Sequence, residues 1–120
     1  MSIKYYVSSK LKHKEFWLNS SIKDQINSTW LFGEELTNPV ELSDMWTKYL
    51  HEIQDCDEFL MYLEPDDIPK GCLIEMGAAF ALGKPIDIVW SGTKQELRDK
   101  LGTIIDHWLV DFYPTLENAL

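Results

Sequence analysis

The chain has 120 residues, the length of one domain, and 45% of them are hydrophobic while 26% are charged. This balance is typical of a globular domain that can bury a core, so we expect a single domain over residues 1–120. Eleven Lys and Arg against 20 Asp and Glu give a net charge of −9. Such a charge argues against a nucleic-acid duplex or a membrane surface as the partner, because both require a basic face. A small phosphorylated ligand remains compatible with it.

The cysteines and the apolar runs bear on the cellular compartment. Cys56 and Cys72 have no CxxC spacing and no clustered histidines beside them, so we expect neither a zinc site nor a cofactor. No apolar run reaches the length of a membrane span, and the N-terminal residues lack the pattern of a signal peptide. We therefore predict a cytoplasmic protein.

The predicted elements alternate along the chain between short apolar runs and helical spacing. Residues 3–7 predict a strand, about 13–26 a helix, and 29–32 a second short strand closed by Gly33. A helix with Pro39 near its start presents apolar residues from 45 to 53, and residues 59–63 form an apolar strand. Residues 73–82 predict a helix that ends at Gly83, followed by a strand at 86–90. A capping box at 93–96 starts another helix, and a strand at 108–112 and a helix at 114–120 complete the pattern.

Strands that alternate with helices predict a parallel sheet with helices on both faces. In such sheets, ligands bind beyond the carboxyl ends of the strands, near the point where the strand order reverses. The loops after Val7, Phe32 and Leu63 are therefore the candidate site.

Glu75 is the acidic residue that this placement singles out. We expect it in the first turn of the helix at 73–82, where the helix dipole and free N–H groups favour an ionised carboxylate. A positioned carboxylate can act as a nucleophile at an acetal-like carbon. The residues alone favour the simpler interpretation, a glutamate that only complements the dipole.

The segment around Glu75 resembles the signature of the nucleoside 2-deoxyribosyltransferase-like superfamily. That signature matches residues 71–86, which read GCLIEMGAAFALGKPI. Weaker similarities flank it on both sides and cover nearly the whole chain: YYVSS at 5–9, NSTWLFGE at 27–34, DEFLMYLEP at 57–65 and TLENAL at 115–120.

The resemblance implies a flavodoxin-like, three-layer α/β/α fold with a five-stranded parallel sheet of order 2-1-3-4-5. It also implies cleavage of the N-glycosidic bond of a nucleoside or nucleotide, with Glu75 as the nucleophile at C1′ of the sugar. Another base or water then resolves the glycosyl-enzyme, by transfer or by hydrolysis. Members of the superfamily form homodimers or larger homo-oligomers, so we expect this chain to do so too.

Two acids of the deoxyribosyltransferases are replaced here, since Tyr49 and Pro69 stand at the matching positions. Protonation of the leaving base then needs another donor, such as Asp66, Asp67 or Tyr49. This departure supports an alternative, a catalytically degenerate protein that binds a nucleotide or a nucleotide-derived signal. Cleavage of the nicotinamide–ribose bond of NAD is a third reading, without further support in the sequence.

The remaining candidates are residues at the predicted strand ends and around the glutamate. The substrate-binding candidates are Tyr6, Ser8, Ser9, Trp30, Tyr49, Glu64, Gly71 and Gly77. The two serines either hold a phosphate or ribose or form an ordinary polar loop. Trp30 either stacks on a base or belongs to the core, and Glu64 either holds ribose hydroxyls or is a solvated loop acid.

Overall fold

A parallel sheet of four strands forms the centre of the molecule, in a computed structural model that describes residues 2–33 and 38–120. The strands are β1 (Tyr5–Ser8), β2 (Glu58–Tyr62), β3 (Ile86–Val89) and β4 (Val110–Tyr113). They lie in the order β1-β2-β3-β4, and every neighbouring pair is parallel. The predicted α/β class with a parallel sheet is confirmed, and the arrangement is consistent with a flavodoxin-like fold.

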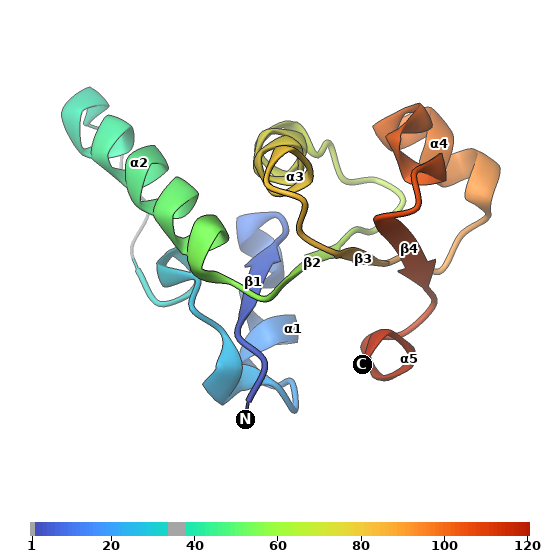
Figure 1. Ribbon diagram of the computed structural model, residues 1–120, viewed down its shortest axis with the longest axis horizontal. Helices are drawn as coiled ribbons and strands as arrows, with labels where there is room; N and C mark the ends of the chain where they lie inside the picture. Colours follow the sequence, from blue (N-terminus) through green and yellow to red (C-terminus); the bar gives the residue numbers. More distant parts are fainter. Residues whose placement is uncertain (1, 34–37) are drawn as a thin grey trace.

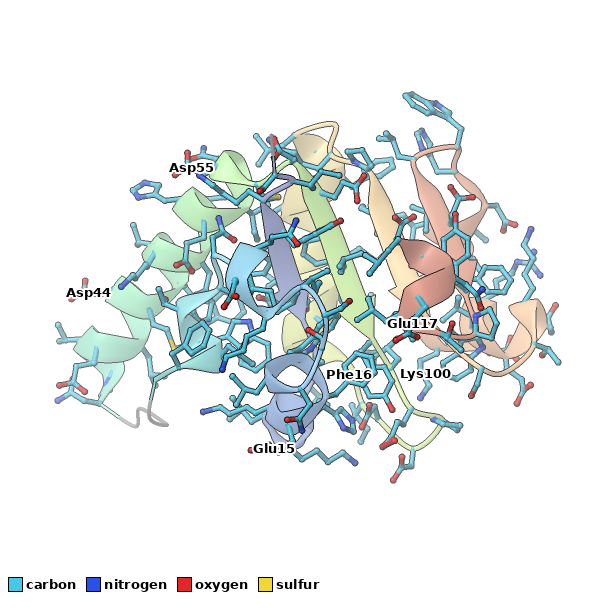
Figure 2. All side chains as sticks on the ribbon, turned by 90° about the horizontal axis from the view of Figure 1, so that it is seen from below. Glu15, Phe16, Asp44, Asp55, Lys100 and Glu117 are labelled. Atoms are coloured by element: carbon cyan, nitrogen blue, oxygen red, sulfur yellow. The ribbon has the colours of Figure 1, made fainter. Side chains whose placement is uncertain are left out.

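Helices cover both faces of this sheet, which gives three layers (Figure 1). The helices are α1 (Lys14–Leu18), α2 (Pro39–Asp55), α3 (Lys70–Ala81), α4 (Lys94–Leu101) and α5 (Leu116–Ala119). In Figure 1, α2, α3 and α4 lie above the sheet, while α1 and α5 lie below it. From below, α1 and α5 stand in front of the strands, and Phe16 lies beside α1 on the side toward α5 (Figure 2). Its ring stacks on Tyr62 of β2 at 3.9 Å between centroids.

One layer of the core lies between the sheet and α3, and it accounts for every second apolar residue of the strands. Tyr6, Phe59, Met61, Ile86 and Ile88 occupy one face of three neighbouring strands, and each is fully buried. Residues at alternate positions of a strand point to the same face, so this set forms one continuous apolar layer. Each such side chain contributes about 1.5 to 3 kcal/mol through its burial. The layer fixes the height of α3 above the sheet, and with it the place of Glu75.

The prediction of a strand at residues 29–32 is wrong, and the fifth strand of the expected sheet is not confirmed. Thr29–Leu31 is a 3₁₀-helix, and only an isolated bridge between Tyr5 and Ile26 pairs with the outer edge of β1. Side chains bind this edge instead: the Val7 N–H donates to Ser28 Oγ at 2.8 Å, and Trp30 Nε1 donates to the Val7 carbonyl at 2.8 Å. The backbone groups that a fifth strand would bind are thus already satisfied.

The single helix expected at about 13–26 is also wrong. The structure has a 3₁₀-helix at Leu11–His13, the short helix α1, and a second 3₁₀-helix at Lys23–Gln25. The apolar residues at spacings of four still face inward, since Ile22 is buried and Leu18 and Ile26 pack against the core. A pattern of inward-facing residues does not require continuous helical hydrogen bonds, so the same spacing suits a chain broken into turns.

The remaining elements follow their local sequence signals. Asn38 caps α2 by accepting from the N–H groups of Val40 and Glu41, with Pro39 in the first turn. Thr93 and Glu96 form the predicted capping box of α4. The last strand and helix begin two residues later than expected, at Val110 and Leu116.

Within the described residues, no helix combines the length and the apolar character needed to cross a membrane.

Candidate functional site

Glu75 lies on the face of α3 that packs against β1. The structure corrects its position in the helix: α3 begins at Lys70 rather than at residue 73, so Glu75 lies in the second turn and no acid lies in the first. The helix starts early because Leu73 N–H already bonds to the Pro69 carbonyl. The dipole argument for an ionised carboxylate therefore loses its basis, since the effect is confined to the first turn.

Two hydroxyl groups of β1 hold the Glu75 carboxylate. The Tyr6 hydroxyl donates to Oε2, and Ser8 Oγ donates to Oε1 at 3.0 Å. Tyr6 and Ser8 lie two residues apart on the strand, so both side chains point to the same face. Both are fully buried, and Glu75 itself is only 8% exposed. The sequence leaves open which of Tyr5 and Tyr6 faces the site, and the structure selects Tyr6.

Burial reverses the expected charge preference of Glu75. Desolvation raises the pKa of Glu75 to about 7, although the hydrogen bonds from Tyr6 and Ser8 act in the opposite direction. The negative charge of Glu52 adds to the increase. The pKa of Tyr6 is also raised, first by burial and then by Glu75, which keeps its hydroxyl protonated as a donor. At neutral pH the Glu75 carboxyl is thus close to half ionised.

A cavity of about 310 Å³ opens onto this carboxyl between β1, α2 and α3. Its lining residues come from the segment between β1 and the start of α1, from Trp30, and from α2 and α3: Ser9, Leu11, Lys14, Trp30, Leu42, Met45, Trp46, Tyr49, Gly71 and Glu75. Three aromatic side chains and several aliphatic ones form the wall. Glu75 is the only carboxyl among these described lining residues, so the cavity combines an apolar wall with one acidic group.

Trp30, in the segment before α2, and Tyr49, on α2, together form an aromatic wall of the cavity. The indole N–H of Trp30 is bound to the Val7 carbonyl, and the residue is 8% exposed, so Trp30 is a core residue that presents part of its ring to the cavity. Tyr49 packs edge-on against Trp46 at 5.5 Å between ring centroids. Burial, with the charges of Glu75 and Glu52, raises the pKa of Tyr49 to about 12.

Ser9 and Gly71 also line the cavity, as the sequence predicts. Ser9 Oγ accepts a hydrogen bond from Trp17 Nε1 at 2.9 Å, which fixes the loop after β1. Gly71 lies in the first turn of α3, and a Cβ there would meet the Trp46 ring at 3.7 Å, an ordinary van der Waals contact. The glycine therefore leaves open space in front of Trp46 rather than relieving a clash.

Glu64 and Gly77 lie away from this cavity among the described residues. Glu64 accepts from the Tyr62 hydroxyl at 3.0 Å and lies 3.5 Å from His13 Nε2. Gly77 is exposed on α3, and no atom lies within 4 Å of a Cβ placed there. The geometry gives neither residue a contact with the cavity that Glu75 lines.

The two loop acids considered as proton donors are also outside the cavity. Asp67 is buried and accepts from His13 Nε2 at 2.8 Å and from the Glu64 N–H at 2.8 Å, while Lys12 lies 3.1 Å from its other oxygen. The side chain of Asp66 is 78% exposed. Asp67 therefore organises the loop after β2 and Asp66 lies at its surface, so Tyr49 is the one of the three suggested donors that lines the cavity.

The wall residues Leu42 and Met45 and the charged neighbours Lys14 and Glu52 were not predicted, whereas Tyr49 was. Leu42, Met45 and Tyr49 recur at intervals of three and four on α2, so helical spacing could have identified this wall. Lys14 Nζ donates to the Gly33 carbonyl at 2.8 Å, and no local signal predicts that contact. Glu52 is one helical turn beyond Tyr49 on the same helix, which also follows from spacing.

A second, wider hollow of about 560 Å³ adjoins the first between α2 and the Trp30 segment. It shares Trp30, Met45 and Tyr49 with the inner cavity, and Lys48 brings a cationic group to it. Within the described residues, no group of three or more His, Cys, Asp or Glu side chains is placed to hold a metal ion. The arrangement thus offers a carboxyl nucleophile or acid beside a stacking surface.

Comparisons of the chain with protein-family models, with curated proteins and with solved structures found no match.

Proposed function

We propose that the chain cleaves the N-glycosidic bond of a nucleoside or nucleotide and that Glu75 is the nucleophile. The observation that carries this proposal is the buried Glu75 carboxyl, which accepts hydrogen bonds from Tyr6 and Ser8 and lines a cavity walled by aromatic rings. An aromatic wall suits a nucleobase, because stacking against a ring needs no hydrogen-bond pattern. A carboxylate at the same cavity suits the anomeric carbon of the attached sugar.

In the proposed reaction, a carboxylate oxygen of Glu75 bonds to C1′ while the bond from C1′ to the base nitrogen breaks. The electron pair of that bond leaves with the base, which takes up a proton. Tyr49 is the hydroxyl of the cavity wall that can approach the base, and with its pKa of about 12 it can donate this proton but does not ionise first. Water or a second base then attacks C1′ and releases the Glu75 carboxylate, and the proton that this nucleophile loses returns to the Tyr49 oxygen.

The hydroxyls of Tyr6 and Ser8 would orient the Glu75 carboxylate for this attack. Each oxygen of the carboxylate accepts one of the two hydrogen bonds, so the plane of the group is fixed before a ligand enters. The proposal includes two further expectations. One is a flavodoxin-like fold in which the chain around Ile26 takes the place of a fifth strand beside β1, and the other is a homo-oligomeric state. The bridge between Tyr5 and Ile26 is the observation that supports the fifth position.

A base-release assay tests the proposal. The protein is incubated with nucleosides, deoxynucleosides, their monophosphates and NAD, and free base is measured by mass spectrometry. We expect release by the wild type and none by Glu75→Gln, while Glu15→Gln, an equal change at an exposed position on α1, retains it. The rate should rise with pH through about 7, because the nucleophile must be ionised. Unchanged release by Glu75→Gln would refute the role of Glu75.

A second candidate function is binding of a nucleotide without cleavage. The observation that favours it is the absence of a second carboxyl among the described residues that line the inner cavity. Under this alternative, a nucleotide raises the melting temperature of the protein and is recovered intact. No base appears in the release assay, and Glu75→Gln changes affinity rather than turnover.

A further inference from the structure

Glu52 of α2 is the polar group that fastens the Trp30 segment to the rest of the site. Its carboxylate accepts the Thr29 N–H at 3.2 and 3.3 Å and the Thr29 hydroxyl at 3.3 Å. Its backbone carbonyl accepts from Asn27 Nδ2 at 2.9 Å. Thr29 begins the 3₁₀-helix that carries Trp30, so these contacts join α2 to the residue that forms one wall of the cavity.

The charge of Glu52 also acts on three groups of the candidate site. It contributes to raising the pKa of Glu75, of Tyr49 and of Tyr6, although burial is the largest cause in each case. Burial raises the pKa of Glu52 itself, while the two hydrogen bonds from Thr29 and the charge of Lys48 lower it. Glu52 is not among the lining residues, so it acts on the site through neighbours and through its field.

We propose that Glu52 is a positioning residue of the candidate site. Its carboxylate holds Thr29, and through Thr29 it fixes the 3₁₀-helix whose Trp30 forms one wall of the cavity beside Glu75. The proposal rests on the proposed function only in taking the cavity beside Glu75 as the place of the reaction. The contact with Thr29 and the field at Glu75 are two separable effects of one side chain.

Other groups around Glu75 set the background against which the effect of Glu52 is measured. The polar and titratable groups of the elements packed around it are Tyr6 and Ser8 of β1, Tyr49 and Glu52 of α2, Cys72 of α3, and Lys14, which lines the cavity. Burial raises the pKa of Cys72 to about 11 and that of Tyr49 to about 12, so both stay neutral across the pH range in which Glu75 titrates. Lys14 donates from its Nζ to the Gly33 carbonyl. Glu52 is thus the negatively charged neighbour whose removal can be tested.

Two substitutions separate the two effects. Glu52→Gln keeps an oxygen that can accept the Thr29 N–H but removes the charge, and Glu52→Ala removes both. Asp55→Asn is the matched control, because it makes the same change in charge at the exposed end of the same helix, where Figure 2 shows the side chain directed away from the sheet. Thr29→Val keeps the N–H and removes only the hydroxyl contact, which provides a second variant if Glu52→Ala folds poorly.

The readouts are two nuclear magnetic resonance signals that need no turnover. Fluorotryptophan labelling reports on Trp30, assigned with Trp30→Phe, and carboxyl ¹³C labelling reports the titration midpoint of Glu75, assigned with Glu75→Gln. We expect Glu52→Ala to displace the Trp30 signal and Glu52→Gln to leave it in place. Both should lower the Glu75 midpoint by at least about 0.3 pH unit, because a like charge is removed. Asp55→Asn should change neither signal.

The proposal is overturned if Glu52→Ala leaves Trp30 unmoved, or if Glu52→Gln leaves the Glu75 midpoint where it is in the wild type. When base release is measurable, the acidic limb of its pH profile should move to lower pH in Glu52→Gln, and KM should rise more in Glu52→Ala than in Glu52→Gln. If base release is absent while both signals respond as expected, the proposed function alone is wrong. If base release and its pH profile are unaffected by either variant, the positioning role alone is wrong.

Discussion

Replacing Glu75 with Gln should make the stability of the protein less dependent on pH. Burial raises the pKa of Glu75 from its ordinary 4.5 to about 7 in the folded chain. An acid whose pKa is higher in the folded than in the unfolded chain opposes folding once it ionises. The penalty is absent below the unfolded value, grows as the pH rises, and is complete above the folded value.

The size of this penalty follows from the shift. One pKa unit corresponds to about 1.4 kcal/mol, so the full penalty is about 3 kcal/mol, of which about 2 to 3 kcal/mol develops between about pH 5 and about pH 8. Gln has no charge to desolvate, although it offers one acceptor oxygen where the carboxylate offers two to Tyr6 and Ser8. Because Gln does not titrate, its own hydrogen bonding adds the same amount at both pH values, and the difference between them depends on the wild-type pKa shift alone.

Urea unfolding of the wild type and of Glu75→Gln at the two pH values measures this effect. We expect the free energy of unfolding of the variant, relative to the wild type, to rise by about 2 to 3 kcal/mol from the lower to the higher pH. Glu15→Gln, at an exposed position, should show no such change. A relative free energy that stays constant within about 0.5 kcal/mol would refute the claim that burial controls the Glu75 carboxyl.

Four further substitutions test other features of the structure. Ser28→Ala leaves the buried Val7 N–H without its acceptor, so chemical denaturation should show a loss of about 1 to 3 kcal/mol. Gly102→Ala should cost about 1 kcal/mol by the same measurement because Gly102 has a φ of 91°, whereas Gly77→Ala, in a helix with free space, should stabilise by about 0.5 to 1 kcal/mol and leave base release intact. Asp87→Asn should raise the melting temperature at pH values above about 6, because burial and the charges of its acidic neighbours raise the pKa of Asp87 to about 6. A melting temperature that falls there instead would contradict this reasoning.

The sheet could be predicted where burial on both faces makes the local sequence uniform. Phe59, Leu60 and Met61 are fully buried, and such a run of apolar residues has few other places in a small domain. The predicted strand at 29–32 shows the limit of this argument. Trp30 and Leu31 are as buried as strand residues, but Trp30 uses its indole N–H where a strand would use its backbone. A contact between a side chain and a distant backbone carbonyl leaves no trace in local spacing.

The candidate site was predicted in its location and only partly in its chemistry. The predicted topology puts the loop after β1 and the start of the helix that carries Glu75 at one edge of the sheet, and the structure brings Tyr6, Ser8 and Glu75 together. The protonation of Glu75 could not be predicted, because desolvation depends on everything packed around the group rather than on its place in a helix. Glu64 does not line the cavity, and this too could not be predicted from local sequence. The hydrogen bond from the Glu64 N–H to Asp67 orients this part of the loop.

The covering of β1 by Ser28 and Trp30 links two properties of this protein that are usually independent. An edge strand with free backbone groups recruits strands from other chains and so promotes aggregation. Here the residue that closes this edge also forms a wall of the cavity. Any replacement of Trp30 that reshapes the cavity for a new ligand also uncovers the Val7 carbonyl. Under the proposed function, a change of ligand specificity made at Trp30 therefore also changes the tendency to aggregate. Leu42 and Met45 line the cavity from α2, and a change of specificity made there leaves the edge of β1 covered.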